Sequence, residues 1–251
     1  MNNYEIVKQF YMEEFKSIDE MDEENILDSL NHGYYPSYQQ YENEIFKYGY
    51  SLYHHMLQGL NINGGKILDV GCGRGGSSKV FKNFKFDEMH GCDINPFSIE
   101  FCKKKFSNIS NMQFRVDDAT NLSYEDSYFD YVINVESSHC YSDINKFFKE
   151  VKRILKPNGI FLYADICASL ERHLSKDLNF FKYIIREDIT KNVAMACEQQ
   201  TKIVKNFEDS DLKTYLIETV YLGIGRKMLY ETKNATFIKY TCCDQATIQQ
   251  N

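Results

Sequence analysis

The chain has 251 residues, with 29 Lys and Arg, 36 Asp and Glu, and a formal net charge of −7 at pH 7. This acidic balance argues against a broad phosphate-binding face, so we expect no nucleic-acid partner. No apolar run approaches the ~20 residues that span a bilayer, and the N-terminus lacks the pattern of a signal peptide, so we expect no membrane insertion.

The first part of the chain, residues 1–62, is expected to form a helical N-terminal cap. The pattern indicates three helices there, at 4–16, 19–30 and 37–58, with a loop at 31–36. From residue 66 the pattern changes to short apolar runs that alternate with helical stretches. The strands expected in this part are 66–70, 87–92, 111–116, 129–135 and 159–165, and the helices are 75–83, 96–106 and 143–155.

Strands that alternate with helices of this length indicate βαβ units and a mostly parallel sheet covered on both faces. An insertion over 166–222 follows, before a last strand at 235–242. The elements expected inside the insertion are a helix at 170–178, a strand at 181–186 and helices at 188–206 and 209–222. Residues 63–245 would then form one doubly wound α/β core, and residues 246–251 a frayed tail.

The eight cysteines are scattered, and none forms a Cys-x-x-Cys pair. Several fall within strand-like apolar runs, as buried free thiols do. A chain of this length buries about 70% of its unfolded surface and needs no disulfide or metal to fold. We therefore expect reduced thiols, a cytoplasmic location and no metal site.

A glycine-rich turn between the first strand and the first helix of the core is the most informative segment. Residues 67–75 read Ile-Leu-Asp-Val-Gly-Cys-Gly-Arg-Gly. Gly71, Gly73 and Gly75 allow a tight turn and a close approach of a ligand to the backbone. Asp69 stands just before the turn, where a pyrophosphate would disfavour a carboxylate but a cationic cofactor would not. An incidental glycine-rich turn is the alternative.

The end of the second strand carries a second acidic residue. The carboxylate of Asp93, which Ile94 follows, can accept hydrogen bonds from both hydroxyls of a ribose. The alternative is a helix N-cap, which Asn95 followed by Pro96 fits well. Both can apply, because Asn95 can cap the helix while Asp93 binds a ligand.

A third acidic segment, Asp117-Asp118-Ala119, follows the third strand. A carboxylate there can accept a hydrogen bond from an adenine amine. Asp118 is favoured over Asp117 because it immediately precedes Ala119. Turn acids that only cap a loop are the alternative. The three loops lie at the carboxyl ends of strands, which is where open α/β sheets bind ligands.

Together these motifs resemble the class I S-adenosylmethionine (SAM)-dependent methyltransferases, over roughly residues 31–195. Residues 67–75 look like the first motif of that family, Asp93 like its ribose-binding acid and residues 117–119 like its adenine loop. That loop is usually Gly-Asp-Ala, so Asp117 departs from the pattern. The resemblance implies a Rossmann-like fold with a seven-stranded sheet, SAM as the cofactor, Cys72 at the cofactor site, and a monomer or homodimer.

Two later segments, residues 134–141 and 163–165, are more particular. They resemble natural-product methyltransferases, such as those that O-methylate phthiotriolone lipids or the sugar of indolocarbazole glycosides. Residues 187–193 fit the same group, and residues 32–35 resemble a loop that closes over the methionine end of SAM. This resemblance implies a small-molecule acceptor, and we expect a hydroxyl of a secondary metabolite such as a polyketide, a lipid or a glycoside. The cofactor contacts that it adds are Tyr34, Asn134 and Glu136.

The expected catalytic residues are His139 and Asp165. An alcohol acceptor needs a base near neutral pH, and His139 follows the fourth strand at the edge where the methyl group would emerge. Asp165 ends the fifth strand and could orient the imidazole. The rate would then rise with pH through an apparent pKa near ~6.5, unless burial or Asp165 shifts it. The alternatives are a substrate-binding or structural His139 and a loop-capping Asp165.

Three other interpretations stay open. The acceptor could be a carbon or an amine, in which case a base is less necessary. The chain could bind SAM without transferring a methyl group, as a cyclase or a binding module. An Mg²⁺ ion could also bind Asp165 and other loop acids.

Overall fold

The structure, a computed structural model, describes residues 27–167, 181–208 and 236–244. The other described positions are 9, 12–13, 16–18, 20, 22, 213–214 and 216. The predicted helices at 4–16 and 209–222 are therefore described only at isolated positions. The predicted helix at 170–178 and the tail at 246–251 lie outside the described residues.

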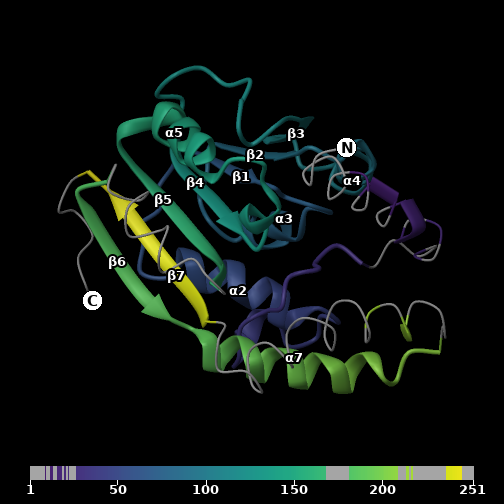
Figure 1. Cartoon of the computed structure of the whole chain (residues 1–251). Helices are drawn as coiled ribbons and strands as arrows, with labels where there is room; N and C mark the ends of the chain where they lie inside the picture. The colour runs from purple at the N-terminus through teal and green to yellow at the C-terminus, as the bar shows by residue number, and fades with distance from the viewer. Residues whose placement is uncertain are drawn as a thin grey trace.

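A seven-stranded sheet with the order β3-β2-β1-β4-β5-β7-β6 forms the centre of the protein (Figure 1). Its strands are β1 (Lys66–Val70), β2 (Glu88–Asp93), β3 (Met112–Val116), β4 (Phe129–Val135), β5 (Leu155–Cys167), β6 (Tyr183–Asp188) and β7 (Thr236–Cys243). The first five strands pair in parallel, and β7 is antiparallel to both of its neighbours. The predicted fold, a mostly parallel Rossmann-like sheet, is confirmed. The strand order reverses between β1 and β4, and ligands bind at such a switch point.

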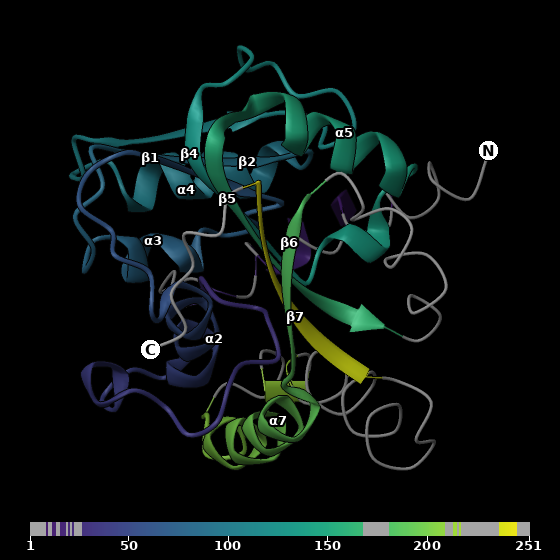
Figure 2. The ribbon, with the colours of Figure 1, turned by 90° about the vertical axis from the view of Figure 1, so that its left-hand side faces the viewer.

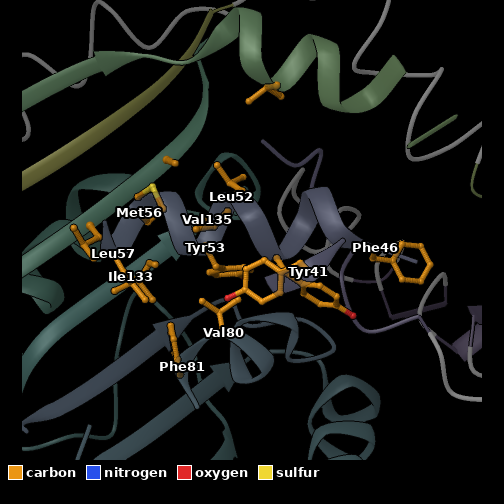
Figure 3. Packing of buried hydrophobic residues seen from close by; sticks show 14 of the residues in the cluster. Tyr41, Phe46, Leu52, Tyr53, Met56, Leu57, Val80, Phe81, Ile133 and Val135 are labelled. Atoms are coloured by element: carbon orange, nitrogen blue, oxygen red, sulfur yellow. The ribbon is translucent and has the colours of Figure 1, made fainter. Parts of the chain in front are cut away.

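Helices cover both faces of this sheet (Figures 1 and 2). The helices in the described residues are η1 (Gln39–Tyr41), α2 (Lys47–Leu57), α3 (Gly76–Phe81), α4 (Pro96–Lys105), η2 (Ser138–Cys140), α5 (Ile144–Ile154) and α7 (Thr190–Val204). α2, α3 and α7 share one hydrophobic core, and α5 packs into a second core on the other face. Figure 3 shows Tyr53 and Met56 of α2 beside Ile133 and Val135 of β4 in the first core. No helix in the described ranges is long and apolar enough to cross a membrane.

Several helices and strands have the predicted bounds because residues at or near their ends determine where they begin and end. β1 and β4 have the predicted bounds, since strands buried on both faces read as continuous apolar runs. α4 begins after Asn95, whose side chain accepts a hydrogen bond from the Phe97 amide (2.9 Å), with Pro96 at the first helical position. α5 begins after Asp143, which accepts from two amides of the first turn (3.0 and 3.1 Å).

Two predictions in the N-terminal cap are wrong. The helix predicted at 37–58 is interrupted between η1 and α2, where Glu42 accepts hydrogen bonds from Ser37 and from Lys47 (2.8 Å). The helix predicted at 19–30 cannot reach its expected end, because residues 27–30 are not helical. The Leu27 carbonyl is bound instead by a distant side chain, as described below.

The region after β4 differs from the prediction in two ways. β5 begins at Leu155 and not at residue 159, because Leu155 already pairs with Phe129 before the register shifts. The described part of the insertion contains the edge strand β6 followed by α7, as the predicted strand at 181–186 and helix at 188–206 indicated. The antiparallel placement of β7 between β5 and β6 was not predicted.

Candidate functional site

The glycine-rich turn leaves the carboxyl end of β1 and is fixed to the end of β2. The Gly71 and Cys72 amides both donate to the Cys92 carbonyl (2.8 and 3.0 Å). The Gly75 amide donates to the Cys72 carbonyl (2.9 Å) and closes the turn before α3. Cys72 itself is buried, so its backbone and not its thiol shapes the open side of the turn.

Three glycines of the turn have positive φ, at 72° for Gly71, 50° for Gly73 and 80° for Gly75. A Cβ on Gly71 would lie 2.3 Å from the Ser137 hydroxyl, and one on Gly75 would lie 2.7 Å from the Phe106 ring. A Cβ on Gly73 would meet nothing within 4 Å. Packing therefore requires the outer two glycines, whereas Gly73 faces open space in which a ligand can approach the backbone.

Asp69, just before the turn, is completely buried. Neither of its carboxylate oxygens has a hydrogen-bond partner among the described residues. Burial raises the pKa of this carboxyl to about 7, although the nearby Ser77 and Tyr53 hydroxyls lower it. The two hydroxyls lie close to this buried carboxylate but do not reach full hydrogen-bond geometry, and a ligand that carries an ammonium group would supply a stronger donor. This is the first observation on which the site fits a cationic cofactor.

Asp93 joins the second motif to the first. Its carboxylate accepts hydrogen bonds from the Gly73 amide and the Asn95 amide, both at 2.9 Å. Burial raises the pKa of Asp93, and the backbone amides lower it. Each oxygen keeps further acceptor capacity, so Asp93 can hold a ribose hydroxyl beside the open face of Gly73. The neighbouring Ile94 is half-buried.

The two acids of the third motif have different surroundings. Asp117 is buried and accepts hydrogen bonds from the Ser123 amide and hydroxyl (both 2.9 Å) and from the Asp118 amide (3.1 Å). Asp118 is half-buried and accepts from the Thr120 amide and hydroxyl (both 2.8 Å). Asp117 thus anchors its own loop, which agrees with the preference for Asp118 as the adenine contact. Ala119 packs into the second core.

Asn134 lies at the carboxyl end of β4 and is completely buried. Its amide nitrogen lies within hydrogen-bond distance of the Val70 carbonyl (2.8 Å), the Ser137 hydroxyl (2.7 Å) and the Tyr141 hydroxyl (2.8 Å). These contacts join the end of β4 to the end of β1. Asn134 therefore supports the sheet edge from inside the protein. Its role as a cofactor contact stays a prediction.

Glu136 connects this edge to the N-terminal part of the chain. It has a positive φ of 50°, and its carboxylate accepts hydrogen bonds from the His32 amide (2.9 and 3.1 Å) and pairs with the His32 ring. Burial lowers the pKa of His32, but the Glu136 carboxylate outweighs it and the pKa is raised. Tyr34 stacks on His55 of α2, with ring centroids 3.9 Å apart. The Glu136–His32 contact thus holds the loop at residues 31–36 beside the carboxyl end of β4.

His139 and Asp165 form the pair that the sequence predicted. His139 Nδ1 lies 2.7 Å from Asp165 Oδ1, and the His139 amide donates to Asp165 Oδ2 (3.2 Å). Asp165 is completely buried, whereas the His139 side chain is 36% exposed. Burial lowers the pKa of His139, but Asp165 raises it to about 11 overall. The pKa of Asp165 is lowered: burial raises it, and the His139 charge outweighs that effect.

Two residues of the site were not predicted. Ser138 donates to Asp165 Oδ2 (2.5 Å) and lies 2.7 Å from the Tyr163 hydroxyl, so it helps to fix the carboxylate. Arg74, inside the glycine-rich turn, is almost completely buried and binds the Leu27 carbonyl (2.5 Å). Ser138 could have been suspected from its place beside His139. Nothing in the sequence pattern indicates that Arg74 points away from solvent.

Among the described residues, no group of three or more His, Cys, Asp or Glu side chains could hold a metal ion. The family model described as "Methyltransferase domain" matches residues 62–218 of the 251. The chain belongs to this family. The resemblance to methyltransferases that the motifs indicated is thereby confirmed, and so is the predicted class of protein.

Curated methyltransferases are similar to this chain over part of their length. The fatty-acid O-methyltransferase of Mycolicibacterium smegmatis is 40% identical over 123 residues, which cover 49% of this chain and 44% of that protein. A phthiotriol/phenolphthiotriol dimycocerosates methyltransferase of Mycobacterium ulcerans is 31% identical over 170 residues, which cover 66% and 62%. The chain therefore spans about half the length of the first of these relatives and less than two thirds of the second.

Solved structures share the fold of this methyltransferase domain. The [4+2]-cyclase SpnF superposes with a TM-score of 0.68 at 17% identity, covering 91% of this chain and 94% of that one. The geranyl diphosphate C-methyltransferase of Streptomyces coelicolor, solved with Mg²⁺, geranyl diphosphate and S-adenosylhomocysteine, gives a TM-score of 0.58 at 16% identity, covering 84% and 87%. At such identities the likeness describes the fold alone.

Proposed function

We propose that this chain binds SAM at the carboxyl edge of β1 and β2 and transfers its methyl group to an oxygen of an apolar small molecule. The observation that carries the oxygen assignment is the His139–Asp165 pair, with Nδ1 and Oδ1 2.7 Å apart at the carboxyl ends of β4 and β5. Because Asp165 occupies Nδ1, an acceptor group would meet the imidazole at Nε2.

The residues that would hold SAM are those around the open face of Gly73. The buried carboxylate of Asp69 suits the ammonium group, Asp93 suits the ribose hydroxyls and Asp118 suits the adenine amine. Glu136 and Tyr34 lie where the N-terminal loop would cover the methionine end. When bound, SAM supplies an electrophilic methyl group on a sulfonium. The protein's part is to orient the acceptor and exclude water, and orientation alone can contribute roughly 7–11 kcal/mol.

The charge of His139 favours one kind of oxygen. Asp165 raises the pKa of His139 to about 11, so the imidazole keeps its second proton at neutral pH and donates a hydrogen bond. A carboxylate acceptor suits such a donor, because it is already ionised and needs no base. An alcohol would need His139 to lose that proton first. The name of the fatty-acid O-methyltransferase relative supports the same assignment, so we propose a long-chain carboxylate as the acceptor.

The test compares three acceptors of equal chain length: a saturated fatty acid, the primary alcohol and the primary amine. Each is incubated with the purified chain and SAM, and release of S-adenosylhomocysteine (SAH) is followed. The proposal expects the acid to react fastest. Fastest release with the amine would move the acceptor from oxygen to nitrogen. Tight SAM binding without SAH release from any acceptor would favour a protein that binds SAM without transferring methyl.

Other predictions from the sequence fit this proposal and stay open. We propose that residues 1–62 and 166–222 frame the acceptor, because His32 of the first binds Glu136 and α7 of the second contacts the same N-terminal loop. Asn192 of α7, for example, donates to the Tyr35 carbonyl (2.6 Å). A monomer or homodimer and a cytoplasmic location remain our expectations.

A further inference from the structure

Arg74 has the one long side chain between Gly71 and Gly75. This side chain points away from the open face of Gly73. Its side chain is only 1% exposed. Nη2 lies 2.7 Å from Asp22 Oδ2, in an ion pair whose carboxylate is fully buried. Nε donates to the Leu27 carbonyl (2.5 Å), and the guanidinium lies 3.6 Å from the centre of the Phe101 ring of α4. Removing one partner of such a buried pair leaves the other charge uncompensated.

Two partners of Arg74 connect it to a segment that we call the strap, residues 27–32: Leu27 belongs to the strap and Asp22 precedes it. Asp22 is also hydrogen-bonded to the strap, because its Oδ2 accepts a hydrogen bond from the Leu27 amide (2.9 Å). Asp28, completely buried on its side chain, pairs with Lys105 Nζ (2.9 Å). A Cβ on Gly76, the first residue of α3, would lie 2.9 Å from the Asp28 carbonyl. The strap therefore packs directly on the start of the helix that follows the turn.

The other end of the strap reaches the loop after β4, where Glu136 lies. His32 is bound by Glu136 through both its amide and its ring. The strap thus runs from the turn after β1 to the loop after β4, the two strands at which the sheet order reverses. A ligand that lies on the open face of Gly73 would have a strap anchor on each side of it.

We propose that Arg74 is a positioning residue that couples the glycine-rich turn to the strap, so that cofactor binding and strap docking stabilise each other. The inference rests on the proposed function only in taking the turn as the cofactor site. Backbone hydrogen bonds fix the turn to the end of β2, but Gly73 and Gly75, which flank Arg74, have no side chain that could reach the strap. The buried guanidinium makes that connection, and coupling of this kind is reciprocal.

The test measures hydrogen exchange of residues 27–32 and the dissociation rate of SAH. In the wild-type chain, SAH should slow exchange of the strap amides. Asp22→Asn removes the charge of the pair and keeps its shape. It should speed SAH dissociation by about tenfold, within the usual range of coupling between sites. Glu20→Gln is the matched control, since Glu20 is an exposed acid in the same part of the chain, and it should match the wild type.

The outcomes separate this inference from the proposed function. A wild-type chain that does not bind SAH at all contradicts the proposed function. An Asp22→Asn chain whose strap exchanges freely while SAH leaves at the wild-type rate overturns the coupling, and Arg74 is then only a structural staple. If Asp22→Asn does not fold, the wild-type experiment still decides, because unchanged strap exchange on SAH binding overturns the inference. Arg74→Lys, which keeps the charge but loses the planar donors, should give an intermediate rate.

Discussion

The sheet edge, with its cofactor side and its acceptor side, is built differently from the segments that cover it. At the edge the deciding contacts are short in sequence: Gly73 reaches Asp93 across 20 residues, and His139 reaches Asp165 across 26. In the covering segments His32 reaches Glu136 across 104 residues, and His55 reaches Glu187 across 132. Turns and neighbouring strands therefore specify the edge, whereas its cover exists only once the whole fold has formed.

The largest expected effect tests the cofactor side. Gly73→Val should abolish SAH binding, with at least a 10³-fold loss of affinity by calorimetry, because the new side chain fills the open face of the turn. The fold should survive, since a Cβ at Gly73 meets no neighbour within 4 Å. The backbone strain at φ 50° should cost about 1–3 kcal/mol of stability.

Gly59 offers a matched control for that strain. It has a positive φ of 83° and also meets nothing within 4 Å of an added Cβ, but it lies beyond the end of α2. Gly59→Val should lose a similar amount of stability in thermal unfolding and keep its affinity for SAH. Normal SAH binding by a folded Gly73→Val chain would remove the turn from the cofactor site.

The next effect tests the acceptor side. His139→Ala should lower kcat for the fatty acid by about 10²-fold, the order of loss when a reacting group is no longer held in line with the group that it attacks. The Kd for SAM should stay within about a factor of three, because the imidazole faces the acceptor. SAH release and calorimetric titration measure the two quantities. A variant within a factor of three of wild type in kcat would leave His139 without a role in transfer.

A smaller effect, on the affinity for SAM, is expected from Asp93, whose carboxylate joins the end of β2 to the glycine-rich turn. Asp93→Ala should weaken SAM binding by about 1.5–3 kcal/mol, the usual contribution of hydrogen bonds to a charged group. The variant also loses the acceptor for the Gly73 amide, so Asp93→Asn is the useful companion. It keeps one acceptor oxygen and should retain part of the affinity. Calorimetry on both variants checks this, and unchanged affinity in Asp93→Ala contradicts it.

The smallest effect separates the two roles of His139. Since Asp165 raises the pKa of His139 to about 11, the wild-type rate with the fatty acid should be flat between about pH 6 and 9. Asp165→Asn removes the main cause of that rise and leaves burial, which lowers the pKa. The variant's imidazole should then lose its proton near or below ~6.5, its ordinary pKa. Its rate should fall by about tenfold as pH increases through that value. A rate that rises instead would show that the neutral imidazole acts as a base.

The same contrast explains what the sequence could predict. The bounds of β1 and β4, the caps at Asn95 and Asp143 and the strand-end acids follow from local chemistry, and the structure has them in place. The pairing of His139 with Asp165 was predicted because both residues end neighbouring parallel strands. The caps depend on one or two turns of chain, and the pairing depends only on the order of neighbouring strands.

The errors lie where distant contacts override local preference. The helix predicted at 37–58 is interrupted, and beside the break Glu44 pairs with Lys79 of α3 (2.9 Å). Residues 27–30 leave the helical pattern where Arg74 binds the Leu27 carbonyl. The expected pKa near 6.5 for His139 did not include the size of the Asp165 effect, which depends on complete burial of that carboxylate. None of these contacts produces a repeating pattern of residues from which it could have been predicted.

The most direct test of the account is the identity of the product formed from SAM that carries a labelled methyl group. The purified chain is incubated with this SAM and a long-chain fatty acid, and the product is analysed by mass spectrometry. The account predicts the methyl ester, with the label on the carboxyl oxygen and one SAH released for each ester formed. Label on a carbon or nitrogen of any acceptor, or SAM that binds at the glycine-rich turn and is recovered unchanged, would contradict it.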